Sequence, residues 1–220
     1  MSNCVDILQV GYSRVLPTVK QPLPIILPSN SEFTYAKANG TSTLVRTPAG
    51  ENIIVDTLGP WDGEKLKDFL QKHSLHPDDI HYVIGTHMHT DHIGNLNMFQ
   101  KAKIQFVGDQ ICTSGDSFYQ NVFPQDGTPI ALCPGVKVVL TPGHTSNDIS
   151  VVVSDVDGMG TVAIVGDLFE NEFDRGVENE HIWLEAGSQY PNMQRLSRKM
   201  IIEKFQPQWI VPGHGNIFRI

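Results

Sequence analysis

Cysteine is scarce in this chain, and the spacing of the three cysteines indicates no disulfide framework. Cys4, Cys112 and Cys133 are odd in number, widely spaced and free of any C-x-x-C pair. This usage favours a reducing compartment over a secreted one. A chain of 220 residues can bury a hydrophobic core without disulfides or structural metals, which excludes the architecture of small stapled domains.

Long apolar runs and an excess of positive charge are also lacking. No apolar stretch reaches the roughly 18 residues of a membrane-spanning helix, and Asp6 and Arg14 interrupt the N-terminal region where a signal peptide needs continuous apolar residues. We therefore expect no membrane association and a cytoplasmic or nuclear location. The formal net charge is −8, so no global basic surface is available for nucleic acid.

Short apolar runs separated by turn residues dominate the sequence. Nineteen Gly and 14 Pro divide a chain that is 40% hydrophobic, which is typical of a compact, loop-rich protein. The β-branched runs predict strands over 5–10, 81–86, 104–107 and 136–141, a hairpin of 42–47 with 52–57, a pair of 149–154 with 160–166, and a last short strand within 208–215.

Two segments have helical periodicity. In 63–71 the side chains of Leu66, Phe69 and Leu70 fall on one face. In 192–205 the predicted apolar face consists of Met193, Leu196, Met200, Ile201 and Phe205. No break in composition divides the chain, so we predict one domain over 1–220, with an N-terminal strand and an extended proline-rich arm in 1–30 and the core in 31–220.

The strongest functional signal is the segment T-H-M-H-T-D-H, directly after the apolar strand 81–86. It places His87, His89, Asp91 and His92 within six positions. Imidazole and carboxylate are the natural ligands of a divalent metal such as zinc. Alternate residues of an extended loop point the same way, so His87 and His89 can share one ion, with Asp91 and His92 facing another.

The same arrangement, an apolar strand followed by a turn and a metal-ligand side chain, occurs three more times. VKVVLTPGH ends in His144, VAIVGD ends in Asp167 and WIVPGH ends in His214. A single zinc ion needs three or four protein ligands, whereas five histidines and two aspartates suit two adjacent ions with one carboxylate between them. The pattern predicts that these donors meet at one sheet edge.

The order His-x-His-x-Asp-His, His, Asp, His resembles the metallo-β-lactamase fold hydrolases over about 42–214. The resemblance implies a four-layer αβ/βα sandwich, an α/β fold of two mixed sheets flanked by helices. It also implies two Zn²⁺ per chain, the first bound by His87, His89 and His144 and the second by Asp91, His92 and His214, with Asp167 bridging. The bridging Asp, in place of Cys, points to the glyoxalase II-like, lactonase and nuclease branches.

A closer resemblance lies in VDTLGPW, TPGHTSNDISVVV, GTVAIVGDLFE and VPGHGNIFRI, which look like the metallo-β-lactamase domain-containing protein 1 family. This family is related to glyoxalase II, and its human-type member is associated with endonucleolytic processing of histone pre-mRNA. Leu58 stands where the superfamily usually has Gly after Asp-Thr. Asp56, in the same turn, is a candidate acceptor that holds the ligand loop from behind.

The resemblance implies an endoribonuclease in which a metal-bridging hydroxide attacks the RNA phosphodiester and Asp91 accepts the proton. The alternative is a small-molecule thioester or lactone hydrolase of glyoxalase II type, which needs no basic groove. A third hypothesis is a metal-binding protein without turnover. His and Asp donors also accept iron or manganese, so the donor set leaves the metal open. A homodimer is expected from the family resemblance alone.

Several residues outside the ligand set have two interpretations. His181 lies in a stretch that passes near the metals in this fold, so His181, Trp183 and Tyr190 are candidates for substrate contact. Asn147 either lines the pocket or forms a turn with Asp148. His73, His76 and His81 are expected to be surface or capping residues. A basic group on the last helix, Arg195, Arg198 and Lys199 with Lys204, is expected to be a solvated helix face.

Overall fold

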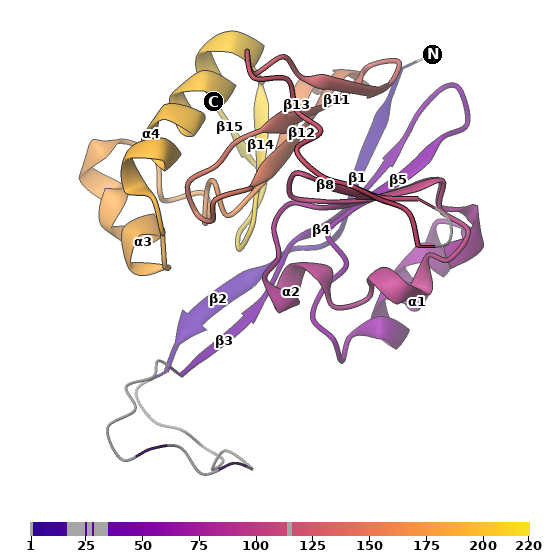
Figure 1. The fold of residues 1–220 in the computed structure, drawn as a ribbon, viewed down its shortest axis with the longest axis horizontal. Helices are drawn as coiled ribbons and strands as arrows, with labels where there is room; N and C mark the ends of the chain where they lie inside the picture. Colours follow the sequence, from indigo (N-terminus) through magenta and orange to yellow (C-terminus); the bar gives the residue numbers. More distant parts are fainter. Residues whose placement is uncertain (1, 17–24, 26–27, 29–34, 114–115) are drawn as a thin grey trace.

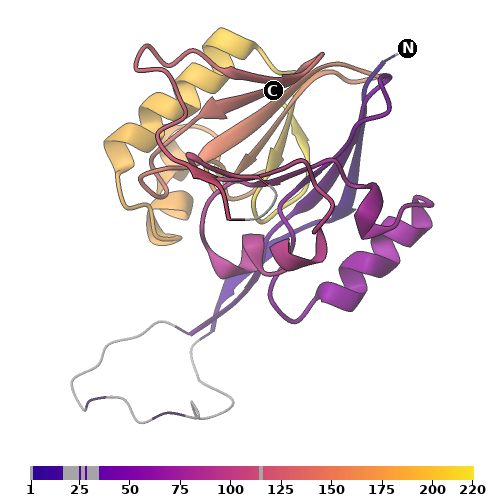
Figure 2. The same ribbon diagram turned by 45° about the vertical axis from the view of Figure 1, so that its right-hand side comes forward.

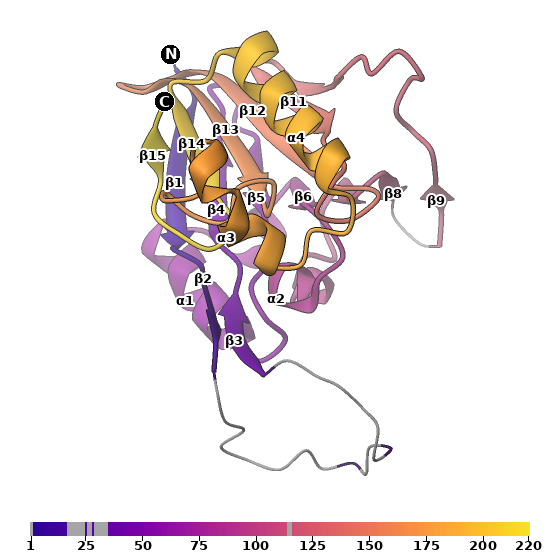
Figure 3. The ribbon, with the colours of Figure 1, turned by 90° about the vertical axis from the view of Figure 1, so that its left-hand side faces the viewer.

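A computed structural model describes residues 2–16, 25, 28, 35–113 and 116–220. One sheet contains, in spatial order, β1 (Cys4–Gln9), β4 (Ser42–Arg46), β5 (Asn52–Val55), β6 (Tyr82–Gly85), β7 (Ile104–Val107), β8 (Gln110–Cys112) and β9 (Phe118–Tyr119). The other contains β10 (Ile130–Cys133), β11 (Val136–Leu140), β12 (Ile149–Val156), β13 (Gly160–Gly166), β14 (Trp209–Pro212) and β15 (Phe218–Arg219). The strands β2 (Tyr12–Val15) and β3 (Ala36–Asn39) form a separate ribbon that projects from the body (Figures 1 and 3).

Apolar side chains alternate between the two faces of each sheet. Successive residues of a strand point to opposite faces. In β4, Val45 packs into the core between the sheets, whereas Leu44 packs on the outer side. In β12, Val151 faces the other sheet and Val152 faces outward. Both faces of each sheet are therefore apolar and each needs a cover.

Helices supply the outer covers. On the first sheet, α1 (Gly63–Lys72) buries Leu66 and Leu70. The second sheet is covered by α3 (Glu180–Glu185), α4 (Pro191–Met200) and the π-helical turn Ile201–Phe205 (Figure 2). The short helices are α2 (Thr90–Ile93) and the 3₁₀ turns Pro77–Asp79, Leu96–Met98 and Val177–Asn179. The layer order of helix, sheet, sheet and helix confirms the predicted sandwich.

Each predicted strand is present, with ends that differ by a few residues at most. The hairpin of β4 and β5 and the pair of β12 and β13 are antiparallel, as predicted. The strands β2, β3, β8, β9, β10 and β15 are not among the predicted ones. Apart from 25 and 28, the proline-rich arm over 17–28 lies outside the residues that the structure describes.

The predicted apolar face of the last helix is partly wrong: Met200, Ile201 and Phe205 pack on the second sheet as predicted, but the residues before them do not. In α4, Met193 is 42% exposed and Leu196 is 68% exposed, while Gln194, Ser197 and Arg198 are buried. The reason is that the helix packs on loop backbone as well as on the sheet. Carbonyl groups of those loops need donors, and polar side chains provide them where apolar ones cannot.

Arg198 also differs from the solvated residue that the sequence predicts. Its guanidinium forms an ion pair of 3.1 Å with the buried carboxylate of Asp174, donates to the Leu168 carbonyl, and stacks 3.8 Å from the ring centre of Phe169. Burial raises the pKa of Asp174, although the hydrogen bond and charge of Arg198 oppose this. In contrast, the ion pair of Arg195 with Glu180 is exposed.

Within the described parts of the chain, no helix combines the length and apolar character that crossing a membrane requires.

The Arg198→Ala variant should lower the free energy of unfolding by about 3–5 kcal/mol, because it leaves the Asp174 carboxylate buried without a counter-charge. Urea unfolding at pH 7 measures the change. The matched control is Arg195→Ala, which removes an exposed ion pair and should have a much smaller effect. Equal losses of stability in the two variants would contradict the distinction between the pairs.

Candidate metal centre

Four loops at the ends of strands bring the seven predicted ligand residues together. His87, His89 and the short helix α2 follow β6, and His144 lies in the loop between β11 and β12. Asp167 directly follows β13, and His214 lies two residues after β14. Since β6 belongs to one sheet and the other strands belong to the second, the cluster lies where the edges of the two sheets meet.

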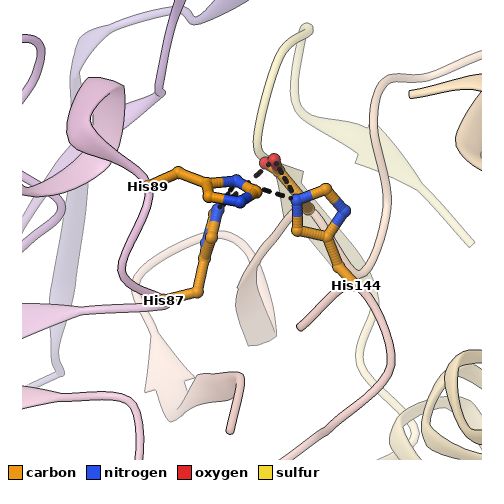
Figure 4. A group of neighbouring side chains, drawn as sticks. His87, His89 and His144 are labelled. Carbon is orange, nitrogen blue, oxygen red and sulfur yellow. Dashed lines mark hydrogen bonds and ion pairs between the residues drawn. The ribbon is translucent and has the colours of Figure 1, made fainter. Parts of the chain in front are cut away.

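The first group of donors consists of His87, His89, His144 and Asp167. Figure 4 shows the three imidazoles turned toward one another. His89 Nδ1 lies 2.9 Å from His87 Nε2 and 3.0 Å from His144 Nε2. Asp167 Oδ2 lies 3.5 Å from His87 Nε2 and 3.3 Å from His144 Nε2. Three nitrogens and one carboxylate oxygen thus converge on one point.

The second group consists of Asp91, His92 and His214. The Nε2 atoms of His92 and His214 are 3.4 Å apart, and the Asp91 carboxylate lies 3.9 Å and 3.8 Å from them. Asp167 also contacts this group, through Oδ1 at 3.2 Å from His92 Nε2 and Oδ2 at 3.3 Å from His214 Nε2. The carboxylate of Asp167 therefore lies between the two groups.

The chemistry of the cluster suits divalent metal ions. Burial and the neighbouring imidazoles lower the pKa of His87, and burial lowers the pKa of His144, so both favour the neutral form that binds metals. Burial opposes ionisation of Asp167, but His214, His92 and His87 outweigh it and lower the pKa of its carboxyl group. Asp167 Oδ1 is buried, and its 3.2 Å contact with His92 Nε2 does not have hydrogen-bond geometry, as expected of an atom that serves a metal.

Asp56 supports the ligand loop from behind, in the position that the sequence predicts. Its Oδ2 lies 2.7 Å from His92 Nδ1, and its two oxygens accept hydrogen bonds from the Thr86 amide and hydroxyl. Burial disfavours the charged form of His92, but the carboxylates of Asp167 and Asp56 outweigh it and raise the pKa of this imidazole. Asp56 thus sets the orientation of the ring and directs Nε2 to the cluster.

The turn that carries Asp56 has left-handed backbone at two residues that are not glycine. Asp56 has φ 60° and Leu58 has φ 61°. Leu58 is fully buried against the core under α1. Glycine adopts this conformation without strain, which explains why the superfamily favours Gly at the position of Leu58. Here the apolar contacts of the side chain offset the unfavourable backbone.

Two glycines give the cluster the room it needs. A Cβ atom at Gly213 would lie 1.9 Å from Asp167 Oδ1, and one at Gly40 would lie 2.6 Å from His92 Nδ1. No side chain fits at either position without moving a cluster residue. The backbone of these two segments therefore packs directly against the donors, which leaves the donors little freedom to move.

Helix α4 anchors two of the ligand loops. Gln194 Nε2 donates to the carbonyls of Asp167 and Leu168, and the Ser197 hydroxyl donates to the Pro142 carbonyl. A Cβ atom at Gly143 would lie 2.3 Å from the Gln194 backbone, so helix and loop touch. The buried polar face of α4 thus holds the loops that carry His144 and Asp167.

A cavity of about 320 Å³ opens beside the second group of donors. His214 and Glu170 line it at the cluster end, and His181, Glu185 and Ser13 line it farther out. His181 is exposed and lines the same cavity as His214, and its contact with substrate stays a prediction. Trp183 does not line this cavity, because its ring is fully buried between helices. Tyr190 is 44% exposed and lines no part of this cavity.

Asn147 and Asp148 form a turn. The Asp148 carboxylate accepts hydrogen bonds from the Thr145 amide and hydroxyl, and Asn147 pairs with the Ser146 hydroxyl. The predicted pocket role of Asn147 has no contact to support it. Two upstream histidines also have local roles: His76 caps a 3₁₀ turn by accepting from Asp78, and His81 accepts from the Asn52 amide.

Glu170 is a cluster residue that the sequence reasoning missed. It is 3% exposed and groups with Asp167 and His214. Burial and the nearby Asp167 and Asp174 raise the pKa of its carboxyl group. The available signal was its place in GDLFE, three residues after Asp167, because an acidic residue next to an apolar, buried segment needs a local partner.

Replacing Asp56 with Ala should weaken divalent metal binding about 10- to 100-fold, because His92 loses the acceptor that fixes its orientation. Competition with a chromophoric chelator measures the affinity. Asp6→Ala is the control, since the contacts of Asp6 are with Arg46, Cys4 and His73 and with no cluster residue. Unchanged affinity in Asp56→Ala would show that His92 holds its position without this support.

Asp148 should make stability depend on pH. Burial raises the pKa of its carboxyl group to about 7, although hydrogen bonds from Thr145 oppose the shift. Between about pH 4 and pH 7 the folded chain therefore keeps this proton, whereas the unfolded chain releases it. The contribution of Asp148 to the free energy of unfolding falls as the pH rises through this range, and it is constant above about pH 7.

Urea unfolding with a chelator present, in buffers from pH 5 to 8, tests this expectation. The stability of the native chain relative to Asp148→Asn should fall from pH 5 to 7 and level off by pH 8. Parallel curves for the two chains would mean that Asp148 is ionised throughout this range.

Comparisons with known proteins agree with this architecture. Residues 37–214 match the metallo-beta-lactamase superfamily. Proteins named metallo-beta-lactamase domain-containing protein 1 are 38% identical in Homo sapiens, over 96% of this chain and 73% of that protein, and 39% identical in Xenopus laevis, over 84% and 74%. The resemblance inferred from the motifs is thereby confirmed.

Solved structures show the same fold at low sequence identity. A quorum-quenching N-acyl homoserine lactone lactonase has a TM-score of 0.60 at 17% identity, covering 97% of this chain and 92% of that one. A metallo-beta-lactamase from Hirschia baltica has a TM-score of 0.59 at 13% identity, covering 98% and 93%. With its His/Asp cluster at the meeting edges of two sheets, the chain is a metal-dependent hydrolase that belongs to the metallo-beta-lactamase superfamily.

Proposed function

We propose that the chain is a dinuclear zinc hydrolase that cleaves a small, uncharged ester, thioester or lactone. The observation that carries the substrate class is the cavity beside His214. Glu170 and Glu185 are among its lining residues, and none of the lining residues in the described parts of the chain is Lys or Arg. The exposed Glu185 carboxylate, with no cation among these described lining residues, disfavours a polyanion and leaves a neutral acyl group as the better fit.

The presence of two groups of donors argues for two bound ions. Neutral imidazoles and carboxylates at these positions match the ligands that zinc prefers, and the shared carboxylate of Asp167 suits a bridge. When bound, the ions would supply a water of lowered pKa and polarise the bond under attack. His87, His89 and His144 would hold one ion, and Asp91, His92 and His214 would hold the other.

The side chains of the site that are partly exposed can take part in proton transfer and substrate binding. The Asp91 side chain is 23% exposed, whereas His92 is fully buried and His214 nearly so. Asp91 can therefore reach the solvent side, where it accepts the proton released as water attacks. His181 lines the same cavity as His214, which supports a role in binding the substrate or in donating to the leaving group.

The endoribonuclease prediction has less support from the distribution of charge. Ser13 and Val15 line the cavity, so alternation along β2 turns Arg14 to the opposite face, together with Lys37, its partner on β3. Several cations of the described chain are paired with carboxylates, among them Arg46 with Asp6, Lys103 with Glu51 and Arg198 with Asp174. These positions form no basic path into the site.

The test combines elemental analysis with assays of one preparation on a simple thioester, a lactone and a labelled single-stranded RNA. We expect two zinc ions per chain, and turnover of the thioester or lactone that a chelator abolishes. Asp91→Asn should lower kcat about 10²- to 10⁴-fold. The control is Asp126→Asn, which changes an exposed loop carboxylate that accepts a hydrogen bond from the Thr128 amide.

The other outcomes identify the competing hypotheses. RNA cleavage that is lost in Asp91→Asn, without thioester or lactone turnover, would establish the endoribonuclease and overturn the proposed substrate class. One iron per chain would overturn the dinuclear zinc site. Two zinc ions without turnover of any substrate would favour a metal-binding protein without catalysis.

A further inference from the structure

The histidines of the cluster differ in how their second ring nitrogen is satisfied. His92 Nδ1 lies 2.7 Å from Asp56, and His214 Nδ1 lies 3.2 Å from the Asn39 carbonyl. His87 Nδ1 lies 3.1 Å from the Thr86 hydroxyl. His144 Nδ1, in contrast, is buried and has no hydrogen-bond partner. Because His144 Nε2 faces His89 and Asp167, Nδ1 is the atom available for support from outside the cluster.

The side chain of Glu170 offers a hydrogen-bond acceptor close to His144 Nδ1. Glu170 Oε1 is 4.0 Å from His144 Nδ1, and it too is buried without a partner. Buried polar atoms are nearly always paired, so two complementary unpaired atoms side by side are an exception that needs a reason. Both atoms have almost no solvent-accessible surface, so each is the natural partner of the other.

The backbone around Glu170 is held firmly. Its amide donates to Asp174 Oδ2, and its carbonyl accepts from the amide of His214. Asp174 is itself fixed by Arg198 on α4. Closing the gap from 4.0 Å to the roughly 2.8 Å of a charge-assisted hydrogen bond therefore needs only a side-chain adjustment.

We propose that Glu170 is a positioning residue that accepts a hydrogen bond from His144 Nδ1–H. This bond fixes the tautomer and the ring orientation, so that the lone pair of His144 Nε2 points to the first group of donors. The proposal rests on the metal-binding role of the cluster under the proposed function. It makes the segment after β13 supply both the shared carboxylate of Asp167 and the support for His144.

Metal affinity gives the first test. Zinc binding to the full chain is measured by competition with a chromophoric chelator for the native chain, Glu170→Gln, Glu170→Met and Glu203→Met. We expect Glu170→Met to weaken binding about 10- to 100-fold, and Glu170→Gln to retain most of the affinity because its amide oxygen still accepts. Glu203, which lies on the surface near Lys199, is the control for loss of a charge.

A spectroscopic measurement gives a test that a merely structural role would not affect. In the zinc-loaded chain labelled with ¹⁵N-histidine, the Nδ1–H of His144 should exchange slowly and resonate far downfield, with His144→Gln used for assignment. Glu170→Gln should move this resonance upfield, because a neutral amide is a weaker acceptor than a carboxylate. This variant keeps the shape of the side chain, so the test remains available if Glu170→Met does not fold.

The outcomes separate this inference from the proposed function. No zinc bound to the native chain would overturn both. Normal zinc binding by the native chain, with equal affinity in Glu170→Met and Glu203→Met, would overturn only the role of Glu170. An equally large loss in Glu170→Gln and Glu170→Met would make Glu170 a direct ligand and also overturn it, as would an unmoved His144 resonance in Glu170→Gln.

Discussion

The buried carboxylate of Asp167 is the constraint on which the rest of the site depends. It lies within 3.5 Å of nitrogens from four histidines that come from both sheets. A lone carboxylate in such a dry place is costly unless positive charge is fixed around it. The close backbone at Gly213, the donors of α4 and the support of His92 by Asp56 all serve to hold that arrangement.

The fold and the metal-ligand cluster were predicted mainly from strand periodicity and from the ligand-type residues that follow the strands. The period of two in β4 and β12 sets which residues lie between the sheets, and His87, His144, Asp167 and His214 meet because each follows a strand of the layered core. The sequence did not reveal the polar contact face of α4, since periodicity assumes that a helix packs on apolar side chains. Gln194 and Arg198 instead meet carbonyls and a carboxylate that only the folded loops provide.

The difference between local patterns and long-range contacts also decides how much of the function the sequence can predict. The layers and the donors follow from local patterns that many hydrolases share, whereas the cavity beside His214 combines β2, the segment after β13 and α3. Contacts between such distant segments leave no periodic signal in the sequence. The acidic lining of this cavity is consequently a property of the tertiary structure, which the motif alone does not reveal.

The attachment of α4 to the ligand loops links metal retention to local unfolding. Gln194 and Ser197 tie the helix to the backbone beside Asp167 and His144, so the loops cannot separate while the helix is docked. Helix and loops thus form one cooperative unit, whose opening exposes the donors together. Loss of an ion and detachment of this helix would then be a single event, in which each bound ion lengthens the lifetime of the closed form.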